Sequence, residues 1–472
     1  MLGLAGLFLP VTAAPAAGGM DPFGTGRYVS PAPHLKWESS LSLPEVKEVP
    51  SVRLPDPARP LSLPELTELA LQNNPKTRQA WYAARAAAAG VGIEQAGDLP
   101  QITGNFLLQR SESGGQSGNQ VTWLTRYGPT VTLSYVLFDF GVGDNRLKAA
   151  QYLALAAALA QNRVLQDVVF QVEQAYYVYL GSDELVKANE LFLKSVSTSL
   201  DANQRRREAG LATVADVYRA ETQVAQAQLN LTRSRGGLEK ARGSLAFAVG
   251  MQVNATLRLQ TLESEPKIRE VTSSLDGMLI QAKAKRPDLV AAEAQARAAR
   301  AQAGAAARTH FPTITVNASI GDTYFRHDQP RHRTDSNSIA LNLSIPLFTG
   351  FNHTYTVRQA EARAAQAEAA RDALSRQTEL EVWQSYYDMQ TAAGGVSTTA
   401  VQLKAAQQTA EATLARYRAG FGSLLDLLTA QVDEANARVQ RIQSYLDWFT
   451  AVARLNYAIG AENKVIYAIQ PK

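Results

Sequence analysis

Side chains that commonly carry out chemistry are few and scattered in this chain of 472 residues. It has no cysteine, which excludes a disulfide scaffold, a thiolate metal site and a cysteine nucleophile. Its histidines lack the i, i+4 spacing of a helical metal pair, and no phosphate-binding loop or nucleophile elbow occurs in a convincing context. The five histidines are His34, His310, His327, His332 and His353. We therefore predict no catalytic residue, no metal and no cofactor.

The most regular pattern of an ionisable residue is an aspartate six positions after a glycine, and it occurs twice. Residues 208–216 read EAGLATVAD, and residues 418–426 read RAGFGSLLD. The glycines, Gly210 and Gly420, fit the left-handed position that ends a helix. The aspartates, Asp216 and Asp426, then fall where the next helix starts, and the macrodipole favours an acid there by about 0.3–1 kcal/mol.

These two segments belong to a tandem repeat that begins at Leu61. Similar residues recur at a spacing of about 210 and in the same order, which is the signature of an internally repeated architecture. The matching pairs are Asn74-Pro75 with Arg286-Pro287, Leu99-Pro100 with Phe311-Pro312, Tyr176-Tyr177 with Tyr386-Tyr387, and Ala248-Val-Gly250 with Ala458-Ile-Gly460.

Each repeat is predicted to be mainly helical. A first helix of roughly 35 residues is expected over about 64–98 and again over about 275–310, because both stretches are rich in alanine. A helix of about 60 residues follows two strands, since no proline interrupts 141–204 or 350–418. After the glycine turn comes a helix of about 35 residues. The longest helices would reach roughly 90 Å, so they must lie side by side in an elongated bundle or tube.

Two predicted strands separate the helices of each repeat, over 102–113 and 125–140 and over 313–326 and 337–349. Apolar residues alternate with small polar ones in them, so that one face of each strand is apolar. Runs of this length suit tilted strands that cross a bilayer. Aromatic residues cluster at the ends of these runs, as they do at the two surfaces of a membrane. A soluble sheet with one wet face would show the same alternation.

Four strands cannot close a barrel in lipid, because the smallest spanning barrels have about eight. If the strands span a membrane, the protein must therefore be an oligomer. Two chains would supply eight strands, whereas three would supply twelve and give approximate six-fold symmetry. The net charge of only +4, from 47 basic and 43 acidic residues, does not suggest a nucleic-acid partner. No apolar run after the N-terminus is long enough for a transmembrane helix.

The domain boundaries follow from composition and from the repeat. Residues 1–17 are interpreted as an export signal whose basic first part is missing, and residues 18–60 as a proline-rich extended segment. A disordered apolar tail is the alternative for the first segment. The repeats are predicted at 61–260 and 275–462. A linker over 261–274 joins them, and a tail over 463–472 follows.

Both repeats resemble the TolC-type outer-membrane efflux protein family, over about residues 61–462. Three sets of segments carry this resemblance: DLPQI at 98–102 with HFPTI at 310–314, LFDFG at 137–141 with LFTG at 347–350, and the turns AGL at 209–211 and AGF at 419–421. The resemblance implies a homotrimer with a 12-stranded outer-membrane barrel and a periplasmic tunnel of helices. It also implies a passive exit duct for an efflux or type I secretion system, which works with a periplasmic adaptor protein and an inner-membrane transporter.

The resemblance also implies roles for the glycine turns, which would lie at the end of the tunnel far from the barrel. Asp426 would be the acid of the constriction, repeated around a ring that attracts cations. Asp216 and Tyr417 would belong to the network that holds the tip closed. The turns themselves would contact the adaptor through Gly210, Leu211, Gly420 and Phe421.

The chain departs from the best-studied family members at two positions near the second turn. Gly422 stands where they have an arginine, and Thr429 stands where they have a second acid. The gate is therefore expected to close differently, with a single ring of carboxylates. The alternative function is a periplasmic coiled-coil scaffold with a β-hairpin recognition head. The residues leave the cargo open among small toxic compounds, metal ions and secreted proteins.

Overall fold

The computed structural model describes residues 30, 32–36, 59–114, 121–255, 257–260, 274–326 and 332–461. The chain divides into two compact units, Met1–Ser51 and Val52–Lys472. The described part of the first unit is a turn in which the Ser30 hydroxyl donates to the Ala32 carbonyl oxygen at 2.7 Å. The predicted export signal and C-terminal tail, nearly all of the proline-rich segment and of the 261–274 linker, and His327 lie outside the described residues.

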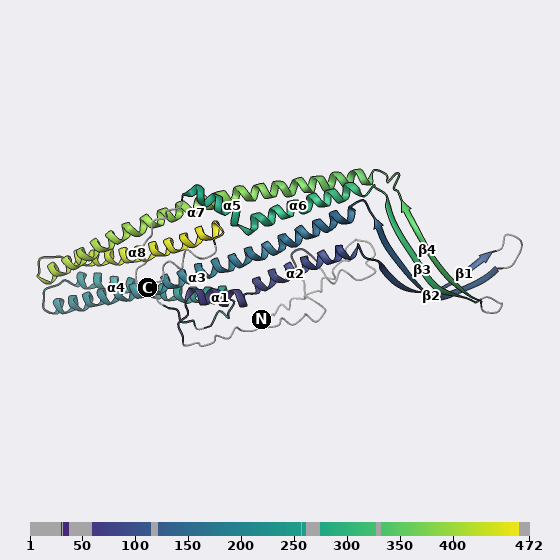
Figure 1. Cartoon of the computed structure of the whole chain (residues 1–472). Helices are drawn as coiled ribbons and strands as arrows, with labels where there is room; N and C mark the ends of the chain where they lie inside the picture. The colour runs from purple at the N-terminus through teal and green to yellow at the C-terminus, as the bar shows by residue number, and fades with distance from the viewer. Residues whose placement is uncertain are drawn as a thin grey trace, which may run out of the picture. The chain divides into compact units, whose positions relative to one another are not determined.

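Two helices of 67 residues each form the main body of the second unit, α3 (Val142–Glu208) and α7 (Asn352–Arg418). Neither contains a proline, and at 1.5 Å per residue each is roughly 100 Å long. Each turns back into a shorter helix, α4 (Val214–Val249) and α8 (Leu424–Ala458), that packs along it. Helix α3 also packs against α8, so the two turns lie at the same end of the bundle (Figure 1).

The first helix of each repeat is broken, which corrects the prediction of one continuous helix of about 35 residues. The structure has α1 (Leu63–Asn73) and α2 (Pro75–Ala96), and later α5 (Leu275–Lys285) and α6 (Pro287–Arg308). Asn74 and Arg286, the residues before the two prolines, have extended ψ angles of 127° and 117°. Because proline excludes the helical conformation from the residue before it, the break outweighs the helix propensity of the surrounding alanines.

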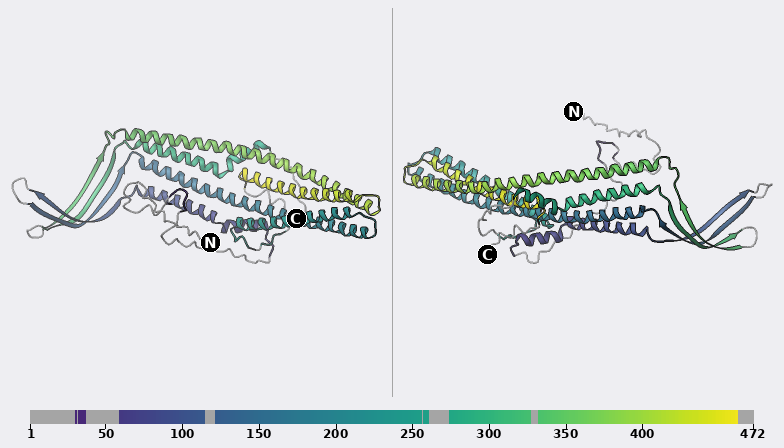
Figure 2. Two further views of the ribbon diagram at one scale, coloured as in Figure 1. Left: turned by 180° about the vertical axis from the view of Figure 1, so that it is seen from behind. Right: turned by 45° about the horizontal axis from the view of Figure 1, so that its top comes forward.

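One antiparallel sheet joins the repeats, with strand order β1-β2-β3-β4. The strands are β1 (Gln101–Gly114), β2 (Val121–Phe138), β3 (Thr313–Arg326) and β4 (His332–Ser344). They extend from the ends of the helices opposite to the two turns (Figures 1 and 2). Strand β4 ends earlier than predicted because Pro346 lacks the amide hydrogen that a ladder requires.

The register of the sheet separates an apolar face from a polar one. Ile102, Leu133, Ala318 and Ile339 face one another across the four strands. The neighbouring row consists only of hydroxyl side chains, and two of its members, Ser319 and Ser338, are hydrogen-bonded at 2.8 Å. In the single chain the apolar side chains of β4 are open to solvent, with Ile339 81% exposed. The predicted alternation is therefore confirmed. The polar row consists of Thr103, Thr132, Ser319 and Ser338.

The buried core lies among the helices near the two proline breaks. Val168 and Val172 of α3 pack with Leu245 and Val249 of α4, and the ring of Tyr177 stacks on Phe449 of α8 at 4.7 Å. A second cluster joins α5, α7 and the end of α8. These two clusters hold the helices of both repeats together. The second tip has a smaller apolar cluster of its own.

Among the described helices, none combines the length and the apolar character that crossing a membrane requires.

Candidate functional site at the helix tips

The two long helices end in the same hydrogen-bonded motif. After α3, Leu211 N donates to Arg206 O at 2.7 Å and Gly210 N donates to Arg207 O at 2.9 Å. After α7, Phe421 N donates to Arg416 O at 2.9 Å. These pairs form a Schellman motif, which requires a left-handed residue. The two glycines supply it with φ angles of 71° and 81°, and this is why glycine recurs at 210 and 420.

The side chains next to the glycines are exposed apolar groups. Leu211 is 69% exposed and Phe421 is 80% exposed. Val214 and Leu425, in the first turns of the next helices, are also exposed. Each tip thus presents an apolar surface that nothing in the described chain covers.

Both aspartates of the repeated motif cap the helices that follow the turns. Asp216 Oδ2 accepts hydrogen bonds from the Thr213 hydroxyl at 2.7 Å and from Thr213 N at 3.1 Å. The hydroxyl bond lowers the pKa of Asp216 below its ordinary value. Asp426 N donates to Ser423 Oγ at 3.1 Å, and its carboxylate accepts from Ser423 N at 3.4 Å. In the single chain the two aspartates therefore act as capping residues at helix starts.

Tyr417 links the second tip to the first repeat. Its hydroxyl donates to Asn203 Oδ1 of α3 at 2.7 Å, and both side chains are buried. Asn203 Nδ2 in turn donates to the Ser199 carbonyl oxygen at 2.7 Å. The guanidinium of Arg206 lies 4.8 Å from the centre of the Tyr417 ring. Tyr417 thus joins α7 to α3, whereas each aspartate bonds to the cap of its own helix.

A second polar contact between the repeats escaped the sequence analysis. Gln431 of α8 is buried, and its Nε2 donates to Ser195 Oγ and Ser199 Oγ of α3, both at 3.0 Å. Ser195, Ser199 and Asn203 occur at intervals of four and share one face of α3. That spacing was the available signal, but it did not reveal the partners, which are more than 200 residues away.

The two positions that the resemblance singles out, Gly422 and Thr429, lie in the second turn and on α8. A Cβ at Gly422 would lie 3.2 Å from Tyr417 N, so a larger residue there would press on the end of α7. Thr429 is exposed on α8. Neither residue carries a charge. Asp426 is therefore the acidic residue in the first turn of α8.

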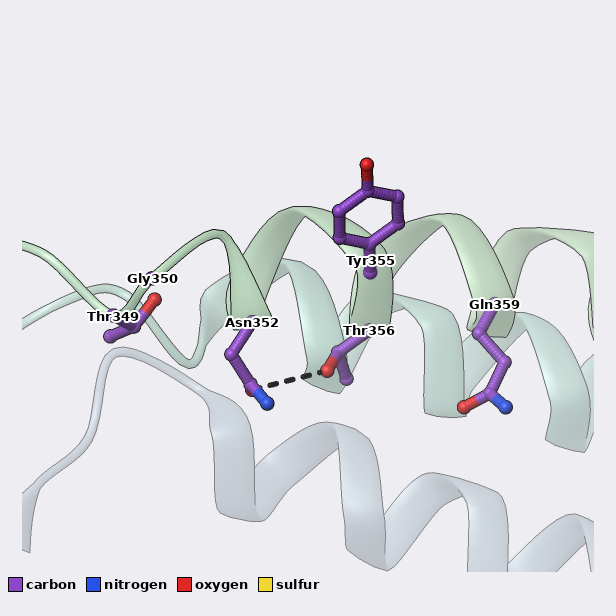
Figure 3. Close-up of a pocket in the computed structure, with 6 residues that line it drawn as sticks. All are labelled: Thr349, Gly350, Asn352, Tyr355, Thr356 and Gln359. Atoms are coloured by element: carbon purple, nitrogen blue, oxygen red, sulfur yellow. Dashed lines mark hydrogen bonds between the residues drawn. The ribbon is translucent and has the colours of Figure 1, made fainter.

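A shallow polar pocket opens at the other end of α7, near the sheet (Figure 3). It is lined by Thr349, Gly350, Asn352, Tyr355, Thr356 and Gln359. Asn352 and Thr356 point into it and share a hydrogen bond of 3.4 Å, while Tyr355 points away. Its amide and hydroxyl groups can form hydrogen bonds, but none of the lining residues is a carboxylic acid, a lysine, an arginine or a histidine.

Tyr417→Phe should destabilise the tip by about 1–2 kcal/mol, because it leaves the buried Asn203 oxygen without a donor. The effect should appear as faster amide hydrogen exchange in the last turns of α3 and α7. The matched control is Tyr218→Phe, since the Tyr218 side chain is exposed at the start of α4. Equal exchange in the two variants would contradict the assigned role of the hydroxyl.

Comparison with known proteins identifies the fold and its class. A family model described as outer membrane efflux protein matches residues 66–251 and 278–461, one segment in each repeat. The chain belongs to the outer membrane efflux protein family. Membership confirms the prediction of a tandem-repeat channel protein of the efflux and secretion type. It also places the protein in the bacterial outer membrane, with its helices extending into the periplasm.

Individual members of the outer membrane efflux protein family match most of the chain. Protein CyaE of Bordetella pertussis is 31% identical over 405 residues, which cover 83% of this chain and 82% of CyaE. Outer membrane protein OprJ of Pseudomonas aeruginosa is 28% identical over 78% of each chain. The crystal structure of a membrane protein from Pseudomonas aeruginosa superimposes with a TM-score of 0.77 at 25% identity, covering 84% of this chain and 93% of its own.

Proposed function

We propose that three copies of the chain assemble into one passive duct that conducts cargo out of the periplasm and catalyses no reaction. The observation that carries the proposal is the open four-stranded sheet with an apolar face and two edge strands, β1 and β4. Lipid tolerates neither unpaired backbone groups nor a free edge, so β4 of one copy must pair with β1 of the next. Three copies supply twelve strands, and two copies supply only the eight of the smallest barrels.

The helices favour the same assembly. Helices α2 and α7 lie at the two sides of the second unit and carry exposed aromatic side chains, including Trp81, Tyr82 and Trp383. A ring of three chains would bring these sides together and cover the aromatic groups. The helices would then continue the barrel as a tunnel, with the two kinds of tip alternating around its far end.

We further propose that the tips receive a periplasmic adaptor protein and, through it, an inner-membrane transporter. The exposed apolar groups at both tips, Leu211 and Phe421, support this role because such surfaces mark sites of protein association. The glycine turns hold these groups at the outermost points of the hairpins. The cargo is a small toxic compound, a metal ion or a secreted protein, and the transporter selects it.

The assembly can be tested by cysteine cross-linking, because the natural chain contains no cysteine. Thr103→Cys on β1 is combined in turn with one cysteine at every second residue over 334–342 of β4. For the one cysteine pair that faces across the β4–β1 contact, oxidation in outer membranes should produce cross-linked species of two and three chains beside the single chain, and none larger. The pair Thr132→Cys and Ser319→Cys is the control, since these residues face each other within one chain and should leave it monomeric on a gel. A ladder that ends at two chains, extends beyond three or is absent at every register would refute the trimer.

We also propose that Asp426 forms a ring of three carboxylates at the narrow end of the tunnel. Its side chain is exposed in the first turn of α8, so the carboxylate can face a pore while the backbone N–H of Asp426 donates to the capping Ser423 hydroxyl. Such a ring attracts cations. The Asp216 carboxylate instead accepts a short hydrogen bond from the capping Thr213 hydroxyl, and the Arg219 guanidinium lies 3.9 Å away. The positive charge of Arg219 weakens the attraction of Asp216 for cations.

Asp426→Asn should reduce the cation preference of the reconstituted channel by roughly two- to fivefold, because exposed charges act through water. Asparagine keeps a capping oxygen, so this variant separates the charge from the cap. The measurement is the reversal potential in a planar bilayer under a potassium chloride gradient. Asp216→Asn is the matched control and should change the preference less. If Asp426→Asn leaves the reversal potential unchanged, the proposed ring is wrong.

A further inference from the structure

Two histidines that are 43 residues apart in sequence meet where the second repeat passes from helix to sheet. His310 follows the end of α6, and His353 lies in the first turn of α7. Their ring centres are 4.6 Å apart, and the ring planes are inclined at 50°. Two imidazoles bound to one metal ion at about 2.0–2.1 Å have ring centres roughly 4.5–5.2 Å apart for angles of about 90–110° at the ion, so this spacing allows both rings to bind one ion.

The hydrogen bonds of the two rings determine which nitrogen of each can bind a metal. His310 Nδ1 lies 2.9 Å from the Ala307 carbonyl oxygen, which can only accept, so this nitrogen carries the proton. His353 Nδ1 lies 3.2 Å from Thr309 Oγ1. The Thr309 hydroxyl gives its one proton to the Ala306 carbonyl oxygen at 2.9 Å and must accept from His353. With the proton on Nδ1, each neutral imidazole has its lone pair on Nε2.

This pattern is the one that supports metal-binding histidines, in which the second ring nitrogen donates to a carbonyl or hydroxyl oxygen. We propose that His310 and His353 form a site for a first-row transition metal ion that prefers imidazole, such as Zn²⁺. No third histidine, cysteine, aspartate or glutamate completes the group among the described residues, so water fills the remaining positions. The bound ion would tie the end of α6 to the start of α7.

The first repeat shows that the fold itself does not require this pair. The equivalent positions hold Asp98 and Gly143, and Asp98 Oδ1 lies 3.3 Å from where a Cβ of Gly143 would be. The two positions thus adjoin in both repeats, but only the second repeat places imidazoles there. The pair is also independent of the proposed trimer and of the gate, because both rings come from one chain and lie at the other end of the helices.

The test is calorimetric titration of the tag-free, chelator-treated protein in detergent with Zn²⁺ alone. We expect one zinc ion per chain in the wild type and no binding of Mg²⁺, which prefers oxygen ligands. His310→Gln and His353→Gln should each remove the binding, whereas His34→Gln should retain it. The helical circular dichroism of each variant shows whether it has folded.

A further variant tests the hydrogen bonds that set the tautomers. Thr309→Val keeps both imidazoles but removes the acceptor for His353, so zinc should bind about 10- to 100-fold more weakly. Three results would overturn the site. The first is a wild type that binds no zinc. The second is zinc binding by both folded single variants, His310→Gln and His353→Gln, that is as tight as in the wild type. The third result is a zinc affinity of Thr309→Val equal to that of the wild type.

Discussion

Arg286→Ala is expected to lower the free energy of unfolding by about 3 kcal/mol. The side chain is 2% exposed, and its guanidinium donates to both carboxylate oxygens of Asp288, at 3.0 and 2.5 Å, and to Glu381 at 2.6 Å. Loss of one partner leaves buried charge without compensation, which typically costs about 3–5 kcal/mol. The acids are partly exposed, so the lower end of that range applies.

The first repeat supplies a matched control for this substitution. Asn74 occupies the place of Arg286, and its amide donates to Ala248 O at 3.2 Å, as Arg286 does to Ala458 O at 3.4 Å. Asn74→Ala removes two neutral hydrogen bonds, this one and the helix cap in which Asn74 Oδ1 accepts from Lys76 N at 3.0 Å, and should cost about 1–2 kcal/mol. Thermal and urea unfolding in detergent measure both variants. If the two substitutions cost the same, the charges of the second repeat add no stability.

The same network makes stability depend on pH in a defined direction. Burial by itself would raise the pKa of Asp288, but the hydrogen bond from Arg286 and the nearby Arg163 outweigh burial and lower it. The folded state therefore favours the carboxylate more than the unfolded chain does. The stabilisation is complete above the ordinary aspartate value of 3.8 and is lost as the pH falls through the lower pKa of the folded state. Asp288→Asn should remove this part of the acid sensitivity in melting curves.

Gly181→Val should cost about 1–3 kcal/mol by overpacking the contact between α3 and α8. Gly181 is buried within α3, and a Cβ at this position would overlap three carbon atoms of the Leu446 side chain. The contact is one of those that join the first repeat to the second. The variant should therefore lower the melting temperature and weaken the alignment of the two hairpins.

A second substitution distinguishes overpacking from a general loss of glycine. Leu446→Ala frees the space, so the double variant should recover part of the stability that Gly181→Val loses. Gly236→Ala, on α4, is the control. A Cβ there meets nothing within 4 Å, so alanine should stabilise the helix by up to about 1 kcal/mol. If Leu446→Ala makes Gly181→Val less stable still, the clash is not the cause.

The sequence was a good guide wherever one periodicity decided the structure. Alternation with a period of two predicted that Leu133 and Ile339 lie on the apolar faces of their own strands, and the strand register shows that these faces belong to one side of the sheet. The absence of proline from 142–208 and 352–418 accounts for two unbroken helices. The prediction of continuous first helices is wrong, because Pro75 and Pro287 impose an extended conformation on the residue before them that the helix propensity of alanine does not overcome.

The sequence located the tip residues but not their partners. The turn motif identified Gly210 and Gly420, because a Schellman motif needs a left-handed residue and glycine adopts that conformation without strain. The bond from Tyr417 to Asn203 crosses 214 positions of the chain. Whether Asp426 faces a pore depends on neighbouring copies of the chain and stays a proposal.

The sequence by itself determined the repeat, the element types and the faces of the strands, since these depend on residues only a few positions apart. The tertiary structure alone decided that Gln431 reaches Ser199, that Arg286 meets Glu381 and that His310 meets His353. Each of these contacts joins helices whose relative rotation is set by packing along their whole length. A small change in that rotation would separate the partners, and no local pattern in the sequence specifies it.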